Sequence, residues 1–190
     1  MHRSFREVIE LLESQGKLVK IKKPVKPEYE MAALMKTLEE ESKAFIFENV
    51  ENSDYKAVGG LFTSMGRYGL IFNDDGSEDF TYEQAGQKVM SGIANPIPYE
   101  HVDSGHVTET ILQGSDIDLT KLPAPTFFEL DTGPFLTAAV GIFKKPNGEI
   151  NVGFYRCLII DKENLLINAS GLSDLRKAYA WHKENNKEMR

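Results

Sequence analysis

The first apolar residues of the chain recur every three or four positions, which predicts an amphipathic helix: Phe5, Val8, Ile9, Leu11 and Leu12. Ser4 and Glu7 form the pattern of a capping box at its start, and Gly16 is placed to end it in a left-handed conformation. A strand over about 17–22 follows. Pro27 can open a second helix, whose apolar face carries a further set of residues: Met31, Leu34, Met35 and Leu38.

The pattern continues as an alternation of strands and helices up to about residue 94. Residues 44–47 and 56–61 are short apolar runs that predict strands. Helices are predicted over 63–72 and 82–93, and the polar stretch 73–77 between them predicts a loop. Alternating strands and helices of this length are typical of a small α/β domain.

The character of the chain changes at residues 95–98, where two prolines force extended backbone, and we place a domain junction there. Residues 122–125 form a second Pro-rich, extended stretch. Asn147 and Gly148 suit a tight hairpin turn. Four β-prone runs predict an antiparallel sheet, which a polar helix led by Ser173 and Asp174 follows: 107–113, 135–143, 150–160 and 165–169.

Charge and cysteine content narrow the classes of partner and compartment. The net charge of −7 disfavours contact with nucleic acid, because an acidic surface repels phosphate backbones. The single cysteine, Cys157, lies in an apolar run and is expected to be a buried, inert thiol. No apolar run reaches the length of a membrane-spanning helix, and the first residues lack the apolar core of a signal peptide. We therefore expect a cytoplasmic protein.

Residues 151–156 place an amide, a tyrosine and an arginine on one predicted strand. Because side chains alternate between the faces of a strand, Asn151, Gly153 and Tyr155 share one face, and Arg156 shares the other with two apolar residues. An unpaired guanidinium is costly on an apolar face, so Arg156 needs a structural carboxylate or a bound anion. The amide oxygen of Asn151 suits Mg²⁺ or Mn²⁺, although an Asn beside a turn is also an ordinary turn residue.

Six segments acquire meaning from their order along nearly the whole chain: 4–19, 44–50, 59–62, 116–125, 131–137 and 151–156. The last reads Asn-Val-Gly-Phe-Tyr-Arg and is similar to the Asn-(Val/Leu)-Gly-x-Tyr-Arg segment of the UbiD family, which are prenylated-FMN-dependent decarboxylases. The segment 131–137 is similar to the family's Gly-Pro-Tyr-(Ile/Leu)-Thr, and 116–125 to its Asp-Leu-x-x-Leu-Pro-x-Pro. Together the six segments resemble the N-terminal half of a UbiD protein.

The resemblance implies a fold and a chemistry. Residues 1–100 would form an N-terminal α/β domain, and residues 101–190 the incomplete start of a split β-barrel that binds the flavin, giving an α/β (α+β) class. The family's reaction is the reversible, non-oxidative decarboxylation of aromatic or α,β-unsaturated acids. Its cofactors would be prenylated FMN and Mn²⁺ or Mg²⁺, with K⁺ as a further candidate ion.

The resemblance also assigns roles to individual residues. Arg156 matches the arginine beside the cofactor and the departing carboxylate, which makes it the candidate catalytic residue. Asn151 matches an asparagine that ligates the divalent metal. The implied cofactor-binding set covers these two residues and their neighbours: Asn151, Gly153, Phe154, Tyr155, Arg156, Thr137 and Ser173.

One stretch departs from the family pattern. Many members carry Met-His-Trp about seventeen residues past the asparagine, whereas residues 167–174 here read Ile-Asn-Ala-Ser-Gly-Leu-Ser-Asp. Asp174 takes the position at which some members place a metal-binding histidine. Its carboxylate can ligate Mn²⁺ or Mg²⁺, or it can be the N-cap of the last helix.

In the family, the metal-binding glutamate and two further catalytic acids come from later sequence. The resemblance therefore implies that these 190 residues are a truncated or fragmentary decarboxylase, or one half of a split enzyme that acts with a chain supplying the C-terminal half. The alternatives are a non-catalytic flavin- or phosphate-binding or supporting subunit, and a structural α/β module without ligand. Unpaired strand edges in an incomplete barrel predict self-association or a complex with that second chain. The substrate would be an aromatic or unsaturated carboxylic acid.

Overall fold

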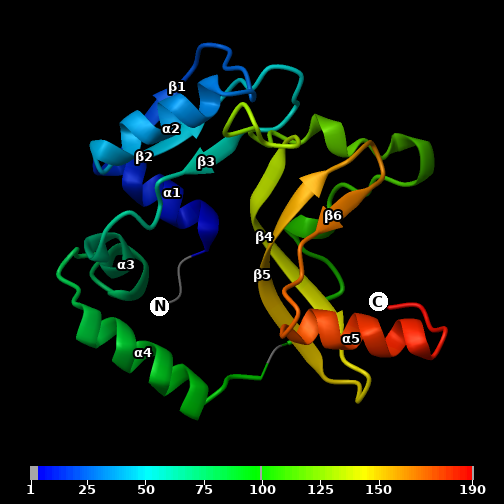
Figure 1. Ribbon diagram of the computed structural model, residues 1–190. Helices are drawn as coiled ribbons and strands as arrows, with labels where there is room; N and C mark the ends of the chain where they lie inside the picture. The colour runs from blue at the N-terminus through cyan, green and yellow to red at the C-terminus, as the bar shows by residue number, and fades with distance from the viewer. Residues whose placement is uncertain (1–3, 99, 190) are drawn as a thin grey trace.

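The computed structural model describes residues 4–98 and 100–189, which fold around two three-stranded sheets (Figure 1). The first sheet joins β1 (Leu18–Ile21), β2 (Ala44–Phe47) and β3 (Ala57–Gly59) in that order. β1 and β2 are parallel, and β3 pairs antiparallel with β2. The predicted mixed α/β class is therefore confirmed, with a small N-terminal α/β sheet followed by a second, antiparallel sheet.

Helices cover both faces of the first sheet, because its strands are apolar on both sides. Ala44 on β2 faces one side, where Leu12 of α1 (Phe5–Ser14) and Leu70 of α3 (Met65–Phe72) pack in one buried cluster. Phe45 and Phe47 face the other side and pack with Met31 of α2 (Glu30–Glu40). This three-layer arrangement is the best-buried part of the molecule.

The ends of the first two helices test the predicted boundaries. Ser4 and Glu7 form the predicted capping box, and Gly16 has a φ of 67° while the Lys17 N–H reaches the Leu12 carbonyl at 2.8 Å. The prediction that Pro27 opens the second helix is wrong, since α2 begins at Glu30. Tyr29 takes a positive φ of 64°, which no helical residue adopts, so helical backbone can start only after it.

The connection between the two sheets carries α4 (Tyr82–Ala94) and three single 3₁₀ turns: η1 (His106–Thr108), η2 (Gly114–Asp116) and η3 (Leu119–Lys121). The predicted strand over 107–113 is wrong, because Val107 is 93% exposed and none of the described strands pairs with this stretch. None of the residues of α4 is buried. Among the described residues, every helix is too short or too polar to cross a bilayer.

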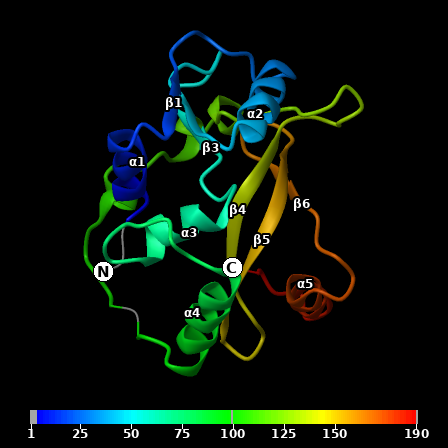
Figure 2. The ribbon, with the colours of Figure 1, turned by 90° about the vertical axis from the view of Figure 1, so that its left-hand side faces the viewer.

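The second sheet is an antiparallel meander of β4 (Phe135–Lys144), β5 (Ile150–Ile159) and β6 (Leu165–Ile167). The β4–β5 turn is closed by the Lys145 N–H, which donates to the Glu149 carbonyl at 2.8 Å, and Gly148 takes a φ of 87°. This confirms the predicted hairpin at Asn147 and Gly148. Helix α5 (Asp174–Glu184) follows β6 and lies beside the hairpin end of the sheet (Figures 1 and 2).

The Pro-rich stretch before β4 ties the two sheets together. Thr126 exchanges backbone hydrogen bonds with the segment before α2, donating to Pro27 at 3.1 Å and accepting from Tyr29 at 3.0 Å. The Phe135 N–H donates to the Pro125 carbonyl at 3.0 Å, which starts β4 at this junction. Ala124 and Thr126 are buried. The start of β4 is therefore held against the N-terminal sheet, while its far end extends away from it (Figure 2).

Candidate functional site

A β-bulge lies near the start of β4, at the end of the β4–β5 hairpin that is far from its turn. Leu136 pairs with Cys157 and Ala139 pairs with Tyr155, so Thr137 and Ala138 together oppose the single residue Arg156. A bulge leaves one residue unpaired, bends the strand and re-aims its side chains, and such bulges are common beside functional sites. The structure thus brings two predicted site residues, Thr137 and Arg156, to the same level of the sheet.

Arg156 lies on a face of the sheet that is open to solvent. The apolar residues that share this face are exposed, and Phe154 is 83% exposed. Within residues 4–98 and 100–189, no carboxylate pairs with the Arg156 guanidinium. Of the two kinds of partner expected for Arg156, the described residues supply no structural carboxylate, and a bound anion stays a prediction. The guanidinium is free to bind an external anion.

The opposite face of the hairpin is closed by Tyr155. A Cβ atom on Gly141 would lie 2.7 Å from the Tyr155 ring, and one on Gly153 would lie 2.8 Å from its hydroxyl oxygen. The ring therefore lies over both glycines, which face each other across the two strands. Gly153 is needed here to make room for Tyr155, a structural role that is separate from the cofactor contact implied by the family resemblance.

The outer edge of β5 is unpaired over most of its length. β6 pairs only with Cys157, Leu158 and Ile159, and in the part of the chain that the structure describes no strand pairs with 150–156 on the edge away from β4. Unpaired N–H and C=O groups along an edge can bind a ligand or another strand. Asn151 and Arg156, on opposite faces and roughly 17 Å apart along the strand, can both be reached by an elongated ligand that follows this edge.

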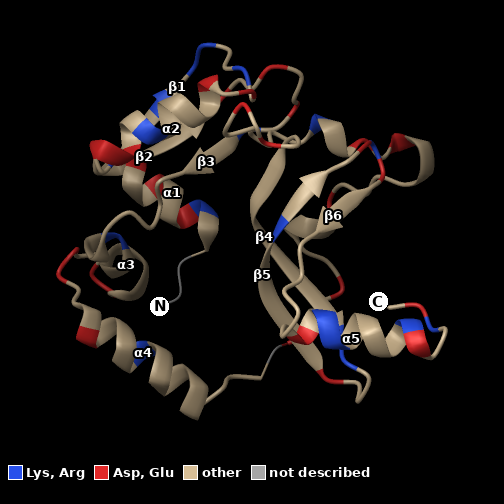
Figure 3. Ribbon diagram, viewed as in Figure 1, with Lys and Arg blue, Asp and Glu red and all other residues tan. Residues whose placement is uncertain are grey.

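Asn151 and Asp174, the two predicted metal ligands, are brought into contact where α5 meets the hairpin. The Asn151 amide donates to Asp174 Oδ2 at 3.1 Å, and Lys145 Nζ lies 3.2 Å from the same oxygen. Lys177 Nζ lies 3.7 Å from Asp174 Oδ1. Figure 3 shows this mixture of charges at the start of α5 and in the turn below it. The hydrogen bond and charge of Lys145, with the weaker influence of Lys177, hold the pKa of Asp174 below its usual value.

Ser173, and not Asp174, is the N-cap of α5. Its hydroxyl accepts from the Arg176 N–H at 3.2 Å and donates to the Ser170 carbonyl at 2.8 Å. The alternative in which Asp174 caps the helix is therefore wrong. Asp174 is the first helical residue, so its side chain projects from the helix toward the hairpin. The hydroxyl of Ser173, which the resemblance places in the cofactor site, is already engaged in this cap.

The side chains of Asn151 and Asp174 have the right chemistry for a hard divalent cation, but their present arrangement suits one only in part. An amide oxygen and a carboxylate are suitable ligands for Mn²⁺ or Mg²⁺. Asn151, however, presents its N–H₂ group to Asp174, and a metal requires the amide oxygen to turn inward. Among the described residues, no three His, Cys, Asp or Glu side chains gather as a metal cluster. Asn151 and Asp174 would thus supply two ligands of a metal whose other ligands come from elsewhere.

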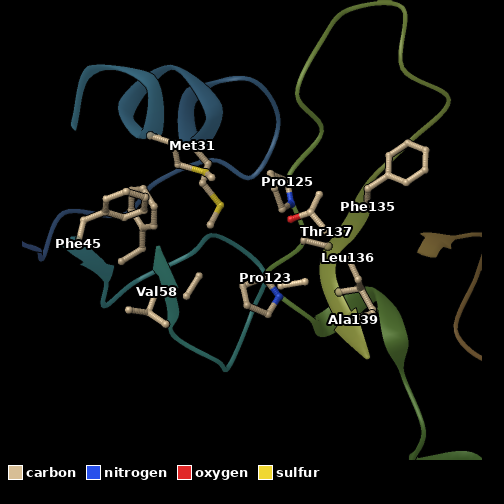
Figure 4. Close-up of a pocket in the computed structure, with 14 residues that line it drawn as sticks. Met31, Phe45, Val58, Pro123, Pro125, Phe135, Leu136, Thr137 and Ala139 are labelled. Atoms are coloured by element: carbon tan, nitrogen blue, oxygen red, sulfur yellow. The ribbon is translucent and has the colours of Figure 1, made fainter. Parts of the chain in front are cut away.

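Thr137 also borders a cavity of about 300 Å³ between the two sheets (Figure 4). Its walls come from α2, β2 and β3 on one side, and from Pro123–Pro125 and the start of β4 on the other. The lining is almost entirely apolar, including Met31, Phe45 and Leu136. Sequence reasoning missed this cavity, since its residues are ordinary core residues that only the packing of the two sheets brings together.

Cys157 and Lys145 differ in how far the sequence indicates their surroundings. Cys157 is buried, as predicted, and desolvation raises the pKa of its thiol, which favours an unreactive form. Lys145 was missed. The sequence marks it only as a turn residue, and β5 and β6 separate it from Asp174 along the chain, so no spacing pattern points to their contact.

Comparison with known proteins finds two matching families in tandem. A sequence model described as the 3-octaprenyl-4-hydroxybenzoate carboxy-lyase N-terminal domain matches residues 9–85. A second, described as the Rift-related domain of the same carboxy-lyase, matches residues 100–190. A protein from Rhodospirillum rubrum, described as an uncharacterized protein in the cooM 5′ region, is 31% identical over 162 residues. That alignment covers 85% of this chain and 34% of the relative.

Solved structures match almost the whole chain. The UbiD-class enzyme HmfF from Pelotomaculum thermopropionicum, solved in complex with FMN, superposes with a TM-score of 0.84 and 28% identity over 97% of this chain. The closed form of vanillic acid decarboxylase from Sedimentibacter hydroxybenzoicus gives a TM-score of 0.88 at 22% identity, which is a likeness of fold alone. This chain spans 40% of the first structure and 42% of the second.

Proposed function

Since the chain belongs to the UbiD family of carboxy-lyases, with the family's N-terminal domain followed by its Rift-related domain, we propose that it is part of a decarboxylase that uses prenylated FMN. The substrate would be an aromatic or α,β-unsaturated carboxylic acid. The observation that carries the proposal is Arg156, an exposed guanidinium without an internal carboxylate partner among the described residues, opposite a β-bulge. HmfF, at 28–29% identity, was solved with FMN and, in an evolved form, with prenylated FMN.

Arg156 is the candidate catalytic residue of this proposal. When bound, prenylated FMN supplies the ring that reacts covalently with the substrate, so the difficult bond cleavage belongs to the cofactor. Arg156 would pair with the substrate carboxylate and orient it, because a guanidinium matches the two oxygens of a carboxylate in geometry and charge. The apolar side chains beside it, Val152 and Phe154, offer a surface against which an aromatic ring can pack.

Asn151, Asp174 and Thr137 would hold the cofactor and its metal. Asn151 and Asp174 would bind Mn²⁺ or Mg²⁺, and K⁺ is a further candidate ion. Thr137 would contact the cofactor from the bulge in β4. The other proposed cofactor contacts lie on β5 and at the start of α5: Gly153, Phe154, Tyr155 and Ser173. Their support is the alignment of 151–156 with the family segment and the contact between Asn151 and Asp174 at 3.1 Å.

We further propose a domain boundary near residue 100 and an active assembly with a chain that supplies the rest of the barrel, or a homo-oligomer. The chain spans about a third of the curated relative and two fifths of the solved structures, and the exposed apolar face of β4 and β5 is available for contact. The cytoplasmic location stays a prediction from the sequence.

The proposal is tested by reconstitution. The chain is combined with the C-terminal portion of a UbiD relative, prenylated FMN and Mn²⁺, and CO₂ release is measured from a panel of aromatic and acrylic acids. Arg156→Gln should lower the rate by about 10²-fold or more, the scale of losing one preorganised charge-stabilising group. Lys183→Gln on α5, away from the bulge, should leave it unchanged. Turnover of no acid by the reconstituted complex would contradict the proposal.

A second candidate is a non-catalytic flavin- or phosphate-binding subunit that supports another chain. The observation that favours it is the engagement of Asp174 by two lysines, which leaves the implied metal position with competing positive charge. A stoichiometric flavin complex that does not turn over, with activity residing entirely in a full-length family member, would support this alternative.

A further inference from the structure

One oxygen of Asp174 is contacted by two donors from the hairpin. Lys145 Nζ lies 3.2 Å and the Asn151 amide nitrogen 3.1 Å from Oδ2. The carboxylate is therefore balanced by an ammonium group that belongs to the chain itself. Lys177 Nζ is farther away, at 3.7 Å from the other oxygen, and the Lys177 side chain is 67% exposed.

A divalent cation and Lys145 cannot occupy this position together. A metal held by Asp174 and Asn151 would need the position beside Asp174 Oδ2 that the Lys145 ammonium and the Asn151 N–H₂ group now occupy. The positive charges of the metal and Lys145 would also repel each other. Metal entry therefore requires Lys145 to leave and the Asn151 amide to present its oxygen.

The backbone of Lys145 is held in the hairpin turn, and its ammonium group also lies 4.0 Å from Glu149 Oε2. Its backbone N–H donates to the Glu149 carbonyl, and its carbonyl accepts from the Gly148 N–H at 2.9 Å, so both backbone groups are fixed in the hairpin closure. Its side chain is 30% exposed, less than half the exposure of Lys177. Less conformational entropy is lost on contact when the backbone is already ordered.

We propose that Lys145 is a built-in cation that competes with the divalent metal for Asp174 and so sets the metal concentration at which the site fills. The proposal rests on the proposed function only in taking Asn151 and Asp174 as metal ligands. Charge at the hairpin turn then determines how readily this chain is loaded with metal. Metal binding also breaks the contact between Lys145 and Asp174 that links the hairpin to α5.

The test is a titration of the 190-residue chain with MnCl₂, with free Mn²⁺ measured by electron paramagnetic resonance. Lys145→Gln should bind Mn²⁺ about tenfold more tightly than the unmodified chain, because a full positive charge next to the ligand has been removed. Lys144→Gln is the matched control. It removes the same charge one residue earlier, at a position that no carboxylate contacts among the described residues, and should change the affinity less than about twofold.

Two further variants keep the result interpretable. Lys145→Arg retains the charge and should bind Mn²⁺ as weakly as the unmodified chain, and Asp174→Asn should abolish the gain when combined with Lys145→Gln. Lys145→Met serves as a second charge-removing variant if Lys145→Gln does not give the circular dichroism spectrum of the unmodified chain.

Equal affinity in the unmodified chain and Lys145→Gln would overturn the proposal, and so would the failure of every variant to bind Mn²⁺. Neither result depends on turnover. If the reconstituted chain decarboxylates an acid but Lys145→Gln does not change its affinity for Mn²⁺, the proposed function stands and this inference is refuted. If Lys145→Gln binds Mn²⁺ more tightly but the reconstituted chain decarboxylates no acid, this inference stands and the proposed function is refuted.

Discussion

The two sheets of this protein differ in what covers them. The first has helices on both faces, and Phe47 and Leu12 are almost completely buried. The second has α5 beside one end and leaves Val140, Val152 and Phe154 at least half exposed on the other face. A sheet covered by helices on both faces buries its own apolar side chains, whereas an apolar face exposed to solvent is a surface for further contacts. The candidate site residues all lie in the second sheet or in the helix that follows it.

The largest expected effect comes from truncating the same side chain in each sheet. Phe47→Ala should lower the free energy of unfolding by about 3–5 kcal/mol, because it leaves a cavity in a closed core. Phe154→Ala should change it by less than about 0.5 kcal/mol, since that ring is already in water. Urea unfolding of both variants measures the difference. Similar losses in the two variants would show that the second sheet is covered in solution, for example by a second copy.

The next effect separates a crowded glycine from an open one. Gly141→Ala should destabilise the protein by about 1–3 kcal/mol, because the new Cβ atom would meet the Tyr155 ring at 2.7 Å. Gly92→Ala in α4 meets no atom within 4 Å and should raise helix stability by up to about 1 kcal/mol. Thermal unfolding compares the two. A neutral Gly141→Ala would mean that the Tyr155 ring moves freely off the strand.

Removing the N-cap side chain of a helix should cost about 1 kcal/mol of stability, and the two regions should show this loss in different measurements. Ser4→Ala removes the cap of α1, which packs Val8 and Leu12 into the first core, so global unfolding by urea should detect the loss. Ser173→Ala removes the cap of α5, and the loss should instead appear as faster amide hydrogen exchange within α5. Equal global losses for both caps would place α5 in the same cooperative unit as the first sheet.

The smallest expected effect is a response to acid in the second region. Hydrogen bonds from the Glu163 N–H and then from Asn164 lower the pKa of Asp161 in the β5–β6 turn. A folded-state pKa below the unfolded value of about 3.9 gives a stabilisation that is present above about pH 4 and lost as the pH falls through the folded-state pKa. Carboxyl carbon NMR should show Asp161 titrating below an unfolded reference, with the turn resonances shifting alongside. Titration at the reference value would contradict this.

Local patterns predicted much of the fold. The capping box at Ser4, the left-handed Gly16, β2 over 44–47 and the hairpin at Asn147 and Gly148 follow from spacing and backbone preferences within a few residues, and all are confirmed. The strand predicted over 107–113 failed for the complementary reason. A β-prone run becomes a strand only when a partner strand lies beside it, and the sequence of the run does not carry that information.

The sequence by itself determined the mixed α/β class, the family, and the strand that carries Asn151 and Arg156, because each depends on residue types and their order along the chain. Only the tertiary structure decided that a bulge sets Thr137 and Ala138 opposite Arg156, and that this face is open. It also decided that Lys145 contacts Asp174. Register, coverage of a sheet face and contacts between distant segments are properties of packing, which no local pattern encodes.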